Sequence, residues 1–489
     1  MGQQEDYFAR VAPLLGRGLA GRLLAFRRPR LTGRLLELLF SCRLDRAVLE
    51  GPDEPAGWPL DRLMRPASGA RATARLLAYL EWKNRFAPLR VLPPGQAAEL
   101  RVDARLLPDG QAPHLVFDPR GPACCLRLLP GDPWSLLDLS YAAAHRIRDF
   151  LLGRAPLPDR PVYVGNHLWP FAETDRAVSA PQSCPLPSSA RIAVVGCGSV
   201  GSELVRLLDG PGIEWQLVDG AKVSVFNPMR QYFGSAEIGQ PKVEALAERL
   251  GRERVTGHRI RLGADRLHLL DAWLQAQRPD LVVLAAGTAD HGPLASRLWR
   301  ARVPHLAVCA YAQARAFEIA CVLPGEGTPC LHCFRGRLFA GPASAPVVDD
   351  ELAAFLYQRL DARSRERLYV DLVAEPAGYI ETGRVAAVAA RCAAEMLRPA
   401  AERGLWFRRM LGASTTCLLG GNAVDRSQSG AHAYGLRYTG QVVRLGVEDL
   451  AGSEEQTRCA VCGRSLDIRH RLDLPETPDA EVDLALLAG

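Results

Sequence analysis

The stretch ARIAVVGCGSVGSELVRLL (residues 190–208) decides the fold of this 489-residue chain. An apolar run leads into Gly196, Gly198 and Gly201, and a helical pattern begins directly after them. Two glycines allow a tight turn that approaches a phosphate, and the third allows helix and strand to pack closely. The free amides at the start of the helix attract an anion. The stretch therefore predicts a strand, a phosphate-binding turn and a helix, which together open a nucleotide-binding domain.

The residues before this stretch predict a separate domain. A chain of 489 residues is long enough for roughly two or three domains. Residues 173–190 are rich in Pro, Ser and Ala and read as a linker. Before them, helical periodicity over about 1–50 and 68–86 is followed by short strand-like runs. We predict an α+β accessory or recognition domain over residues 1–180.

The residues after the linker alternate regularly between strand and helix patterns. Strand-like runs at 191–196, 214–219 and 280–286 are separated by helical segments. This alternation predicts an α/β domain with a Rossmann-like, doubly wound, mainly parallel sheet. We place that domain at residues 188–465 and expect the acidic residues 466–489 to form a loose tail.

Composition excludes several classes of protein. The net charge of +6 is scattered along the chain, so nucleic-acid binding is not predicted. No apolar run reaches about 18 residues, so no membrane span is expected. The N-terminus lacks the basic and then apolar build of a secretion signal, which predicts a cytoplasmic protein. Thirteen cysteines are too few for a disulfide scaffold in a chain of this length.

Polar residues after the second predicted strand favour ATP over a redox dinucleotide. Asp219 follows that strand, 18 positions after Gly201, where an acidic residue would bind ribose hydroxyls. Arg230 and Lys242 come soon afterwards. Cleavage of a triphosphate needs cations on its phosphates, whereas the diphosphate of NAD is held mainly by backbone amides. An NAD-dependent oxidoreductase, the alternative, would leave both cations unused.

Two C-x-x-C pairs predict a structural zinc site. Cys330 and Cys333 form the first pair, and Cys459 and Cys462 form the second. Four thiolates complete a closed tetrahedral zinc site with no open position for chemistry. Such a site would hold a distant C-terminal segment against the sheet.

Together these motifs resemble the adenylation domain of the ThiF/MoeB family and of ubiquitin-like modifier activating enzymes. The resemblance covers roughly residues 188–465, and its signatures appear in the family's order. They are the G-x-G-x-x-G turn, Asp219, NPMRQ at 227–231, IGQPKVEAL at 238–246, PGEGTPCLHC at 324–333 and RCAVCG at 458–463.

The resemblance implies a reaction. The C-terminal glycine carboxylate of a ubiquitin-like protein would attack the α-phosphate of ATP, giving an acyl-adenylate and pyrophosphate. The family pattern places Asp219 on the ribose, Arg230 and Lys242 on the phosphates, and Asn227 and Gln231 beside the nucleotide. It also implies Mg²⁺, a homodimer and a conjugating-enzyme-like partner.

The chain departs from the family at three places. The second acidic residue that the family often has near Asp219 is Ala221 here. Where the family usually has a metal-binding aspartate, VVLAAGTADHG (282–292) has Ala or Thr, and Asp290 is the nearest carboxylate for Mg²⁺. No cysteine lies between Cys333 and Cys392, and the apolar helix around Cys392 predicts a buried, inert thiol. A thioester is therefore not predicted. The adenylate would pass directly to a partner or to a hydroxyl, for which the candidates are Ser344, Ser364 and Thr382.

Within the same fold, adenylation of a tRNA-borne or peptide carboxylate is also open. Two further alternatives share the fold. The first is a sulfur-carrier protein adenylyltransferase of the thiamine or molybdopterin type. Such enzymes usually have a shorter segment before the glycine turn, so the long N-terminal region favours modifier activation. The second is an inactive scaffold that uses the fold only to bind a partner, which the absence of the usual metal aspartate would fit.

Overall fold

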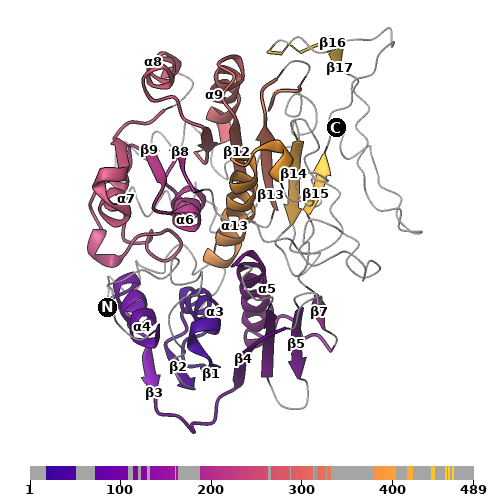
Figure 1. Ribbon diagram of the computed structural model, residues 1–489. Helices are drawn as coiled ribbons and strands as arrows, with labels where there is room; N and C mark the ends of the chain where they lie inside the picture. The colour runs from indigo at the N-terminus through magenta and orange to yellow at the C-terminus, as the bar shows by residue number, and fades with distance from the viewer. Residues whose placement is uncertain are drawn as a thin grey trace, which may run out of the picture.

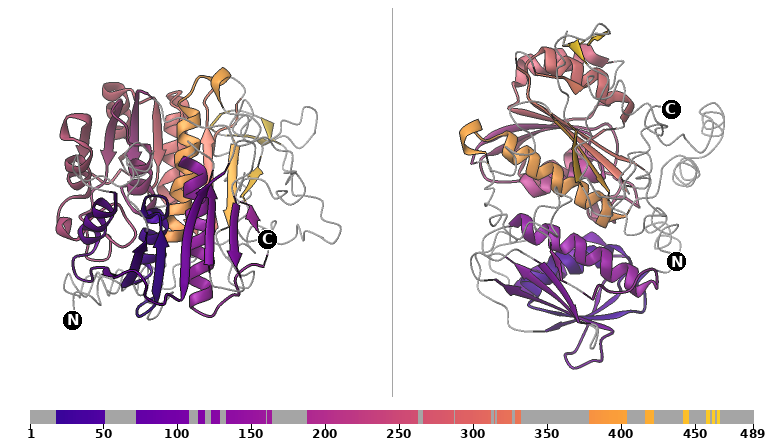
Figure 2. Two further views of the ribbon diagram at one scale, coloured as in Figure 1. Left: turned by 60° about the horizontal axis from the view of Figure 1, so that its bottom comes forward. Right: turned by 90° about the vertical axis from the view of Figure 1, so that its right-hand side faces the viewer.

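The protein is described by a computed structural model. The residues that it describes are 18–50, 72–107, 114–118, 123–128, 133–159, 161–163, 188–262, 266–286, 288–311, 314, 316–325, 328–331, 378–403, 416–421, 442–445, 457–459, 461–462 and 465–466. They form two large sheets with helices packed between them (Figures 1 and 2). None of the helices in these ranges combines the length and the apolar character of a membrane-spanning segment.

The first sheet is mostly parallel and has the strand order β3-β2-β1-β4-β6-β5-β7. Only β5 runs antiparallel to its neighbours. The strands are β1 (Leu23–Arg27), β2 (Arg46–Glu50), β3 (Arg90–Leu92), β4 (Leu100–Leu106), β5 (His114–Asp118), β6 (Ala123–Leu128) and β7 (Val162–Tyr163). The helices are α3 (Pro29–Ser41), α4 (Ala72–Lys83) and α5 (Pro133–Leu151).

The prediction of helical structure up to about residue 50 was wrong for β1 and β2. Three consecutive residues of β1, Leu24, Ala25 and Phe26, are fully buried. A central strand of a parallel sheet is covered on both faces, so its sequence is a continuous apolar run without alternation. A run of this kind cannot be distinguished from a buried helix by periodicity alone.

The second sheet confirms the predicted Rossmann-like, doubly wound architecture. Its order is β10-β9-β8-β11-β12-β13-β14-β15, parallel from β10 to β12 and antiparallel afterwards. The strands are β8 (Ala190–Val195), β9 (Ile213–Val218), β10 (Val255–His258), β11 (Leu281–Leu284), β12 (His305–Tyr311), β13 (Ala316–Val322), β14 (Thr416–Gly421) and β15 (Val442–Leu445). The helices are α6 (Ser199–Leu208), α7 (Lys242–Leu250), α8 (Leu267–Gln277), α9 (Thr288–Arg300) and α13 (Tyr379–Met396). A short hairpin, β16 (Thr457–Arg458) and β17 (Ser465–Leu466), lies outside both sheets.

The two sheets begin with the same plan. In each, the first four strands have the spatial order third, second, first, fourth. In each, a helix follows the first strand and packs on a later long helix, α3 on α5 and α6 on α13. The two helix pairs meet between the sheets, where α5 packs against α13 (Figure 2, right). Gly383 of α13 allows this close approach, because a Cβ there would lie 2.7 Å from the hydroxyl of Tyr141 in α5.

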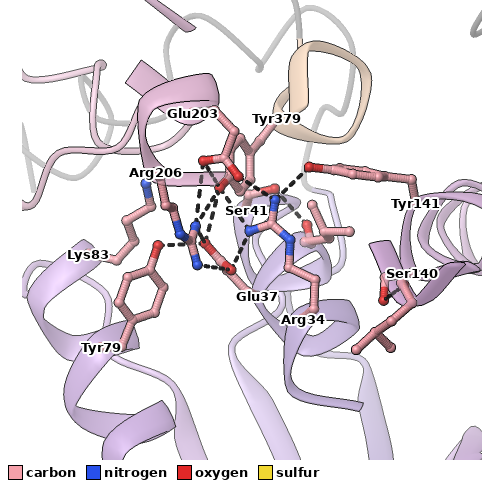
Figure 3. A network of polar contacts seen from close by, with 12 residues as sticks. Arg34, Glu37, Ser41, Tyr79, Lys83, Ser140, Tyr141, Glu203, Arg206 and Tyr379 are labelled. Atoms are coloured by element: carbon pink, nitrogen blue, oxygen red, sulfur yellow. Dashed lines mark hydrogen bonds and ion pairs between the residues drawn. The ribbon is translucent and has the colours of Figure 1, made fainter. Parts of the chain in front are cut away.

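A buried ionic network joins α3 to α6 in this middle layer (Figure 3). Its four charged members are Arg34 and Glu37 of α3 and Glu203 and Arg206 of α6, with side chains that are 1% exposed or less. Arg34 donates to Glu203 at 2.7 Å, and Arg206 donates to Glu37 at 2.8 Å. The positive and negative charges of these four groups balance.

Three tyrosines from three other helices complete the network. Tyr79 of α4 donates to Glu37 at 2.6 Å, and Tyr379 of α13 donates to Glu203 at 2.7 Å. Arg34 donates to the hydroxyl of Tyr141 of α5 at 2.6 Å. The network thus connects five helices, α3, α4, α5, α6 and α13.

The network keeps its charges although they are buried. Burial alone would raise the pKa of the Glu37 carboxyl, but the guanidinium groups of Arg206 and Arg34 outweigh this effect and hold the pKa well below its ordinary value. Removal of one member would leave a buried charge without its partner, which is far more costly than loss of an exposed pair.

We expect Arg206→Met to lower the free energy of unfolding by about 3–5 kcal/mol, because Glu37 and Glu203 would lose a shared counter-charge inside the protein. Denaturant unfolding measures the loss. The matched control is Arg252→Met, which breaks the exposed pair between Arg252 and Glu248 and should cost less than about 1 kcal/mol. Equal losses in the two variants would contradict a structural role for the network.

Candidate functional site

The glycine turn lies at the carboxyl edge of the parallel strands of the second sheet. Strand β8 has β9 on one side and β11 on the other, so the order of the strands reverses at β8. In open α/β sheets, ligands bind in the crevice at such a reversal. Gly196 follows β8 and Asp219 follows β9 at this same edge.

The three glycines occupy three different environments. Gly196 has a φ of 97°, and a Cβ there would lie 2.7 Å from the backbone of Ala285. A Cβ on Gly201 would overlap the carbonyl oxygen of Gly196. A Cβ on Gly198, which caps the start of α6, would meet no atom within 4 Å. Two glycines are therefore required by packing, while the third opens onto free space beside the amides of α6.

Asp219 is fixed directly beside the glycine turn. One carboxylate oxygen accepts a hydrogen bond from the Cys197 N–H at 2.7 Å, and the other accepts from the Ala221 N–H at 2.7 Å. The side chain is half-buried. An ionised carboxylate has about four acceptor positions, so each oxygen retains capacity for a further donor such as a hydroxyl.

Residues 227–234, which we name the arginine loop, form a turn built on Asn227. The side-chain oxygen of Asn227 accepts from the Ser224 N–H at 2.9 Å. Its backbone carbonyl accepts from the N–H groups of Arg230 and Gln231 at 3.0 and 2.9 Å. Asn227 thus shapes the loop that presents the next two predicted residues.

Arg230 and Gln231 are buried with unused polar atoms. Arg230 is 7% exposed, and its Nε has no hydrogen-bond partner among the described residues. The side-chain oxygen of Gln231 is likewise buried without a described partner. A buried donor without an acceptor costs about 1–3 kcal/mol. The Nε–H of Arg230 therefore lacks an acceptor in the described part of the chain. An anionic ligand would supply one.

Lys242 approaches the glycine turn from the start of α7. Its backbone N–H donates to the Ala221 carbonyl at 3.0 Å, next to the Asp219 segment. Burial raises the pKa of the Cys197 thiol well above its ordinary value, the Asp219 carboxylate adds to the rise, and the Lys242 ammonium opposes it. Asp219 and Lys242 therefore both act electrostatically on the turn. No hydrogen bond or ion pair to this ammonium occurs within the described residues.

Ser202 links the arginine loop to the glycine turn. Its hydroxyl donates to the Gly198 carbonyl at 2.6 Å and accepts from the Tyr232 N–H at 3.0 Å. The sequence analysis missed this residue, because a serine in the first turn of a helix usually bonds only within that helix. Its second partner, 30 positions away, is visible only in the fold.

Asp290 lies in the first turn of α9, shortly after β11. Its backbone is thus near the carboxyl edge of the sheet. Its side chain is outside the described part of the chain. The assignment of Asp290 to Mg²⁺ stays a prediction.

Three of the four predicted zinc ligands lie together. The sulfur atoms of Cys330, Cys459 and Cys462 are all within 4.8 Å of one another, and those of Cys330 and Cys459 are 3.6 Å apart. Two ligands of a tetrahedral zinc ion with bonds of about 2.3 Å lie about 3.8 Å apart. The geometry of these three thiols therefore fits zinc. Cys333 is outside the described residues.

The described cysteines offer no exposed thiol for a thioester. Cys392 is fully buried in α13, as predicted. Cys125 is half-buried, and burial raises the pKa of its thiol. The other described cysteines outside the zinc cluster are buried. A reactive cysteine needs access and a stabilised thiolate, and none in this part of the chain has both.

Comparison with known proteins identifies one family. Residues 185–394 match the ThiF family. No curated protein matches the chain.

Solved structures of MccB are similar to parts of the chain. E. coli MccB with MccA-N7isoASN is 17% identical with a TM-score of 0.37, over 57% of this chain and 68% of that chain. E. coli MccB with ATP is 17% identical with a TM-score of 0.31, over 43% of this chain and 56% of that chain. The microcin C7 biosynthetic enzyme MccB in complex with N-formylated MccA is 16% identical with a TM-score of 0.37, over 56% of this chain and 68% of that chain.

The two glycine positions give a matched test of the turn. We expect Gly201→Ala to lower the free energy of unfolding by about 1–3 kcal/mol or more, because its Cβ would overlap backbone that cannot move away. Gly198→Ala adds its methyl group to open space and should change stability by less than about 1 kcal/mol. Denaturant unfolding of both variants measures the difference. A Gly201→Ala variant as stable as Gly198→Ala would contradict this account of the turn.

Proposed function

Residues 185–394 form a ThiF family domain, and from this premise we propose that the chain is an ATP-dependent adenylating enzyme that activates the C-terminal glycine of a ubiquitin-like protein. The observation that carries the proposal is the buried guanidinium of Arg230, whose Nε has no partner among the described residues. A second cation, Lys242, approaches the same glycine turn. A triphosphate is a ligand that needs both cations.

The proposed reaction transfers AMP to a carboxylate. A carboxylate oxygen of the carrier's terminal glycine attacks the α-phosphorus of ATP, the bond from the α-phosphorus to the bridging oxygen breaks, and pyrophosphate leaves with that electron pair. The carboxylate is already ionised, so no general base is required. The enzyme contributes position and charge neutralisation.

Each residue of the site has a proposed task. The space beside Gly198 and the amides at the start of α6 receive a phosphate. Asp219 accepts from the ribose hydroxyls, and Arg230 and Lys242 neutralise the departing phosphates. The side-chain amide oxygen of Gln231, which has no described partner, orients the nucleotide. Mg²⁺, with Asp290 as its proposed protein ligand, would supply further neutralisation of the phosphates.

The acyl-adenylate is proposed to be the species handed on. None of the described thiols suits a thioester intermediate, so the activated carrier would pass directly to a second protein. A homodimer and a conjugating-enzyme-like partner remain predictions from the family resemblance. The sulfur-carrier reaction uses the same adenylation step and differs only in the carrier.

ATP–pyrophosphate exchange tests the proposal. With Mg²⁺ and a small ubiquitin-fold protein ending in glycine, we expect exchange that depends on the carrier. Lys242→Ala should lower the exchange rate by about 100-fold, because one cation on the reacting phosphates is lost. The matched control is Lys222→Ala, an exposed lysine in the neighbouring segment, which should keep its activity.

The outcomes separate the alternatives. Exchange only with sulfur-carrier proteins would replace the ubiquitin-like substrate by that class. ATP binding without exchange for any carrier would favour the inactive scaffold. Binding of NAD in preference to ATP would overturn the proposal.

We further propose that one structural zinc ion is bound by Cys330, Cys333, Cys459 and Cys462. Purified protein should contain about one zinc ion per chain, and Cys459→Ala should lose it, because three thiolates no longer close a tetrahedral site. Elemental mass spectrometry measures the zinc content. Cys392→Ala, which removes a buried thiol elsewhere, should keep the ion. Zinc-free wild-type protein, or equal loss in both variants, would contradict the assignment.

A further inference from the structure

The C-terminal end of α4 contacts the arginine loop. Helix α4 belongs to the first sheet's half of the molecule, whereas the arginine loop belongs to the second. The contacts come from residues 82–85, at the end of α4 and directly after it. No feature of the sequence placed these residues near the candidate site.

Lys83 forms the central contact. Its ammonium donates a hydrogen bond to the backbone carbonyl of Gln231, the residue after Arg230. The side chain is 3% exposed and lies with its nitrogen 5.1 Å from the ring centre of Tyr379. In Figure 3, Lys83 lies next to Tyr79 and Arg206 at the edge of the buried ionic network. The same lysine therefore contacts both the arginine loop and the helices between the sheets.

Trp82 packs against the end of the arginine loop. A Cβ on Gly234 would overlap the Trp82 indole, so ring and backbone are in direct contact. The Tyr232 ring meets the Trp82 ring edge-on at 5.9 Å. On the far side, the Arg249 guanidinium lies 3.5 Å from the centre of the Trp82 ring and pairs with Glu237 at 2.8 Å. The indole is thus fixed between the loop and α7.

Ser235, the residue directly after the arginine loop, makes two hydrogen bonds to the end of α4 and the residues that follow it. Its hydroxyl donates to the Trp82 carbonyl at 3.3 Å and accepts from the Arg85 N–H at 3.2 Å. The first contact uses a carbonyl near the end of a helix, where carbonyls lack partners within the helix.

Burying a lysine side chain costs free energy, because its charged form loses contact with water. Burial lowers the pKa of Lys83 to about 7, although Glu37 partly opposes the change. An apolar side chain of similar length would avoid this cost but would remove the only contact from α4 among the two donors that the Gln231 backbone carbonyl has in the described residues, the other being the Phe233 N–H at 2.8 Å within the arginine loop. The hydrogen bond to the arginine loop is therefore what a lysine provides here.

We propose that Lys83 is a positioning residue for adenylation, which holds the arginine loop, and with it Arg230, in the place where Ser202 links this loop to the glycine turn. This inference rests on the proposed function of Arg230. It makes the proposed nucleotide site depend on the first sheet's half of the protein, although no described residue of that half hydrogen-bonds to the glycine turn.

Lys83→Met in the full-length protein tests the proposal with two readouts. In ATP–pyrophosphate exchange, the KM for ATP should rise about tenfold, because the Arg230 guanidinium is no longer held in place. In hydrogen–deuterium exchange, the amides of residues 230–234 should lose protection, while those of β8 and β9 stay protected. The second readout requires no activity.

The matched control is Tyr79→Phe, one turn earlier on α4. It removes the hydrogen bond to Glu37 but no contact with the arginine loop, so it should lower the unfolding temperature and leave the KM for ATP unchanged. Should Lys83→Met not fold, Ser235→Ala removes only the hydroxyl contact with α4 and should show both effects in weaker form.

The results that would overturn the proposal are specific. An unchanged KM together with unchanged protection of residues 230–234 in Lys83→Met would remove the positioning role. Equal rises of KM in Lys83→Met and Tyr79→Phe would mean that general destabilisation is the cause. Absence of exchange in the wild type would instead count against the proposed function, while the protection measurement would still decide whether Lys83 holds the loop.

Discussion

The four buried charges between α3 and α6 are the constraint on which the rest of the molecule depends. Two arginines and two glutamates lie in a layer with almost no exposure, and each charge pairs with one opposite charge on its own helix and one on the other helix. Separating the partners of a buried ion pair would leave uncompensated charges inside the protein, so these pairs favour one relative position of the two helices. The network therefore fixes how the two sheets lie relative to each other, and the Tyr79 hydroxyl of α4 is hydrogen-bonded to it.

The two sheets share a strand order but differ at the end of their first strands. After β8 the chain makes the glycine turn, which opens beside Gly198. After β1 the residue with positive φ is Arg28, at 52°, and its guanidinium donates to the Ala104 carbonyl of β4 at 2.8 Å. A side chain thus bridges the crevice between the first and fourth strands that stays open in the second sheet. One half forms the nucleotide site, and the other supports it.

Features that depend on residues close together in the sequence could be predicted. The glycine turn, the strand before it and Asp219 lie within 30 residues, and their spacing follows from the geometry of one strand–helix–strand unit. The ionic network could not be predicted, because Arg34 and Glu203 are 169 positions apart and each alone reads as a surface charge. The contact of Lys83 with the arginine loop could not be predicted either, since a lysine at the C-terminal end of a helix is common. The prediction for β1 was wrong for another reason, because a strand buried on both faces shows no alternation of apolar and polar residues.

The choice of lysine at position 83 follows from the same electrostatics. The chain contains only three lysines, and two of them, Lys83 and Lys242, are buried. An arginine at position 83 would add a permanent charge beside a network whose charges already balance. Lysine can lose its proton when burial lowers its pKa to about 7, and the neutral amine still donates to the Gln231 carbonyl. Lysine is thus the basic side chain that can hold the arginine loop without forcing an uncompensated charge into the protein interior.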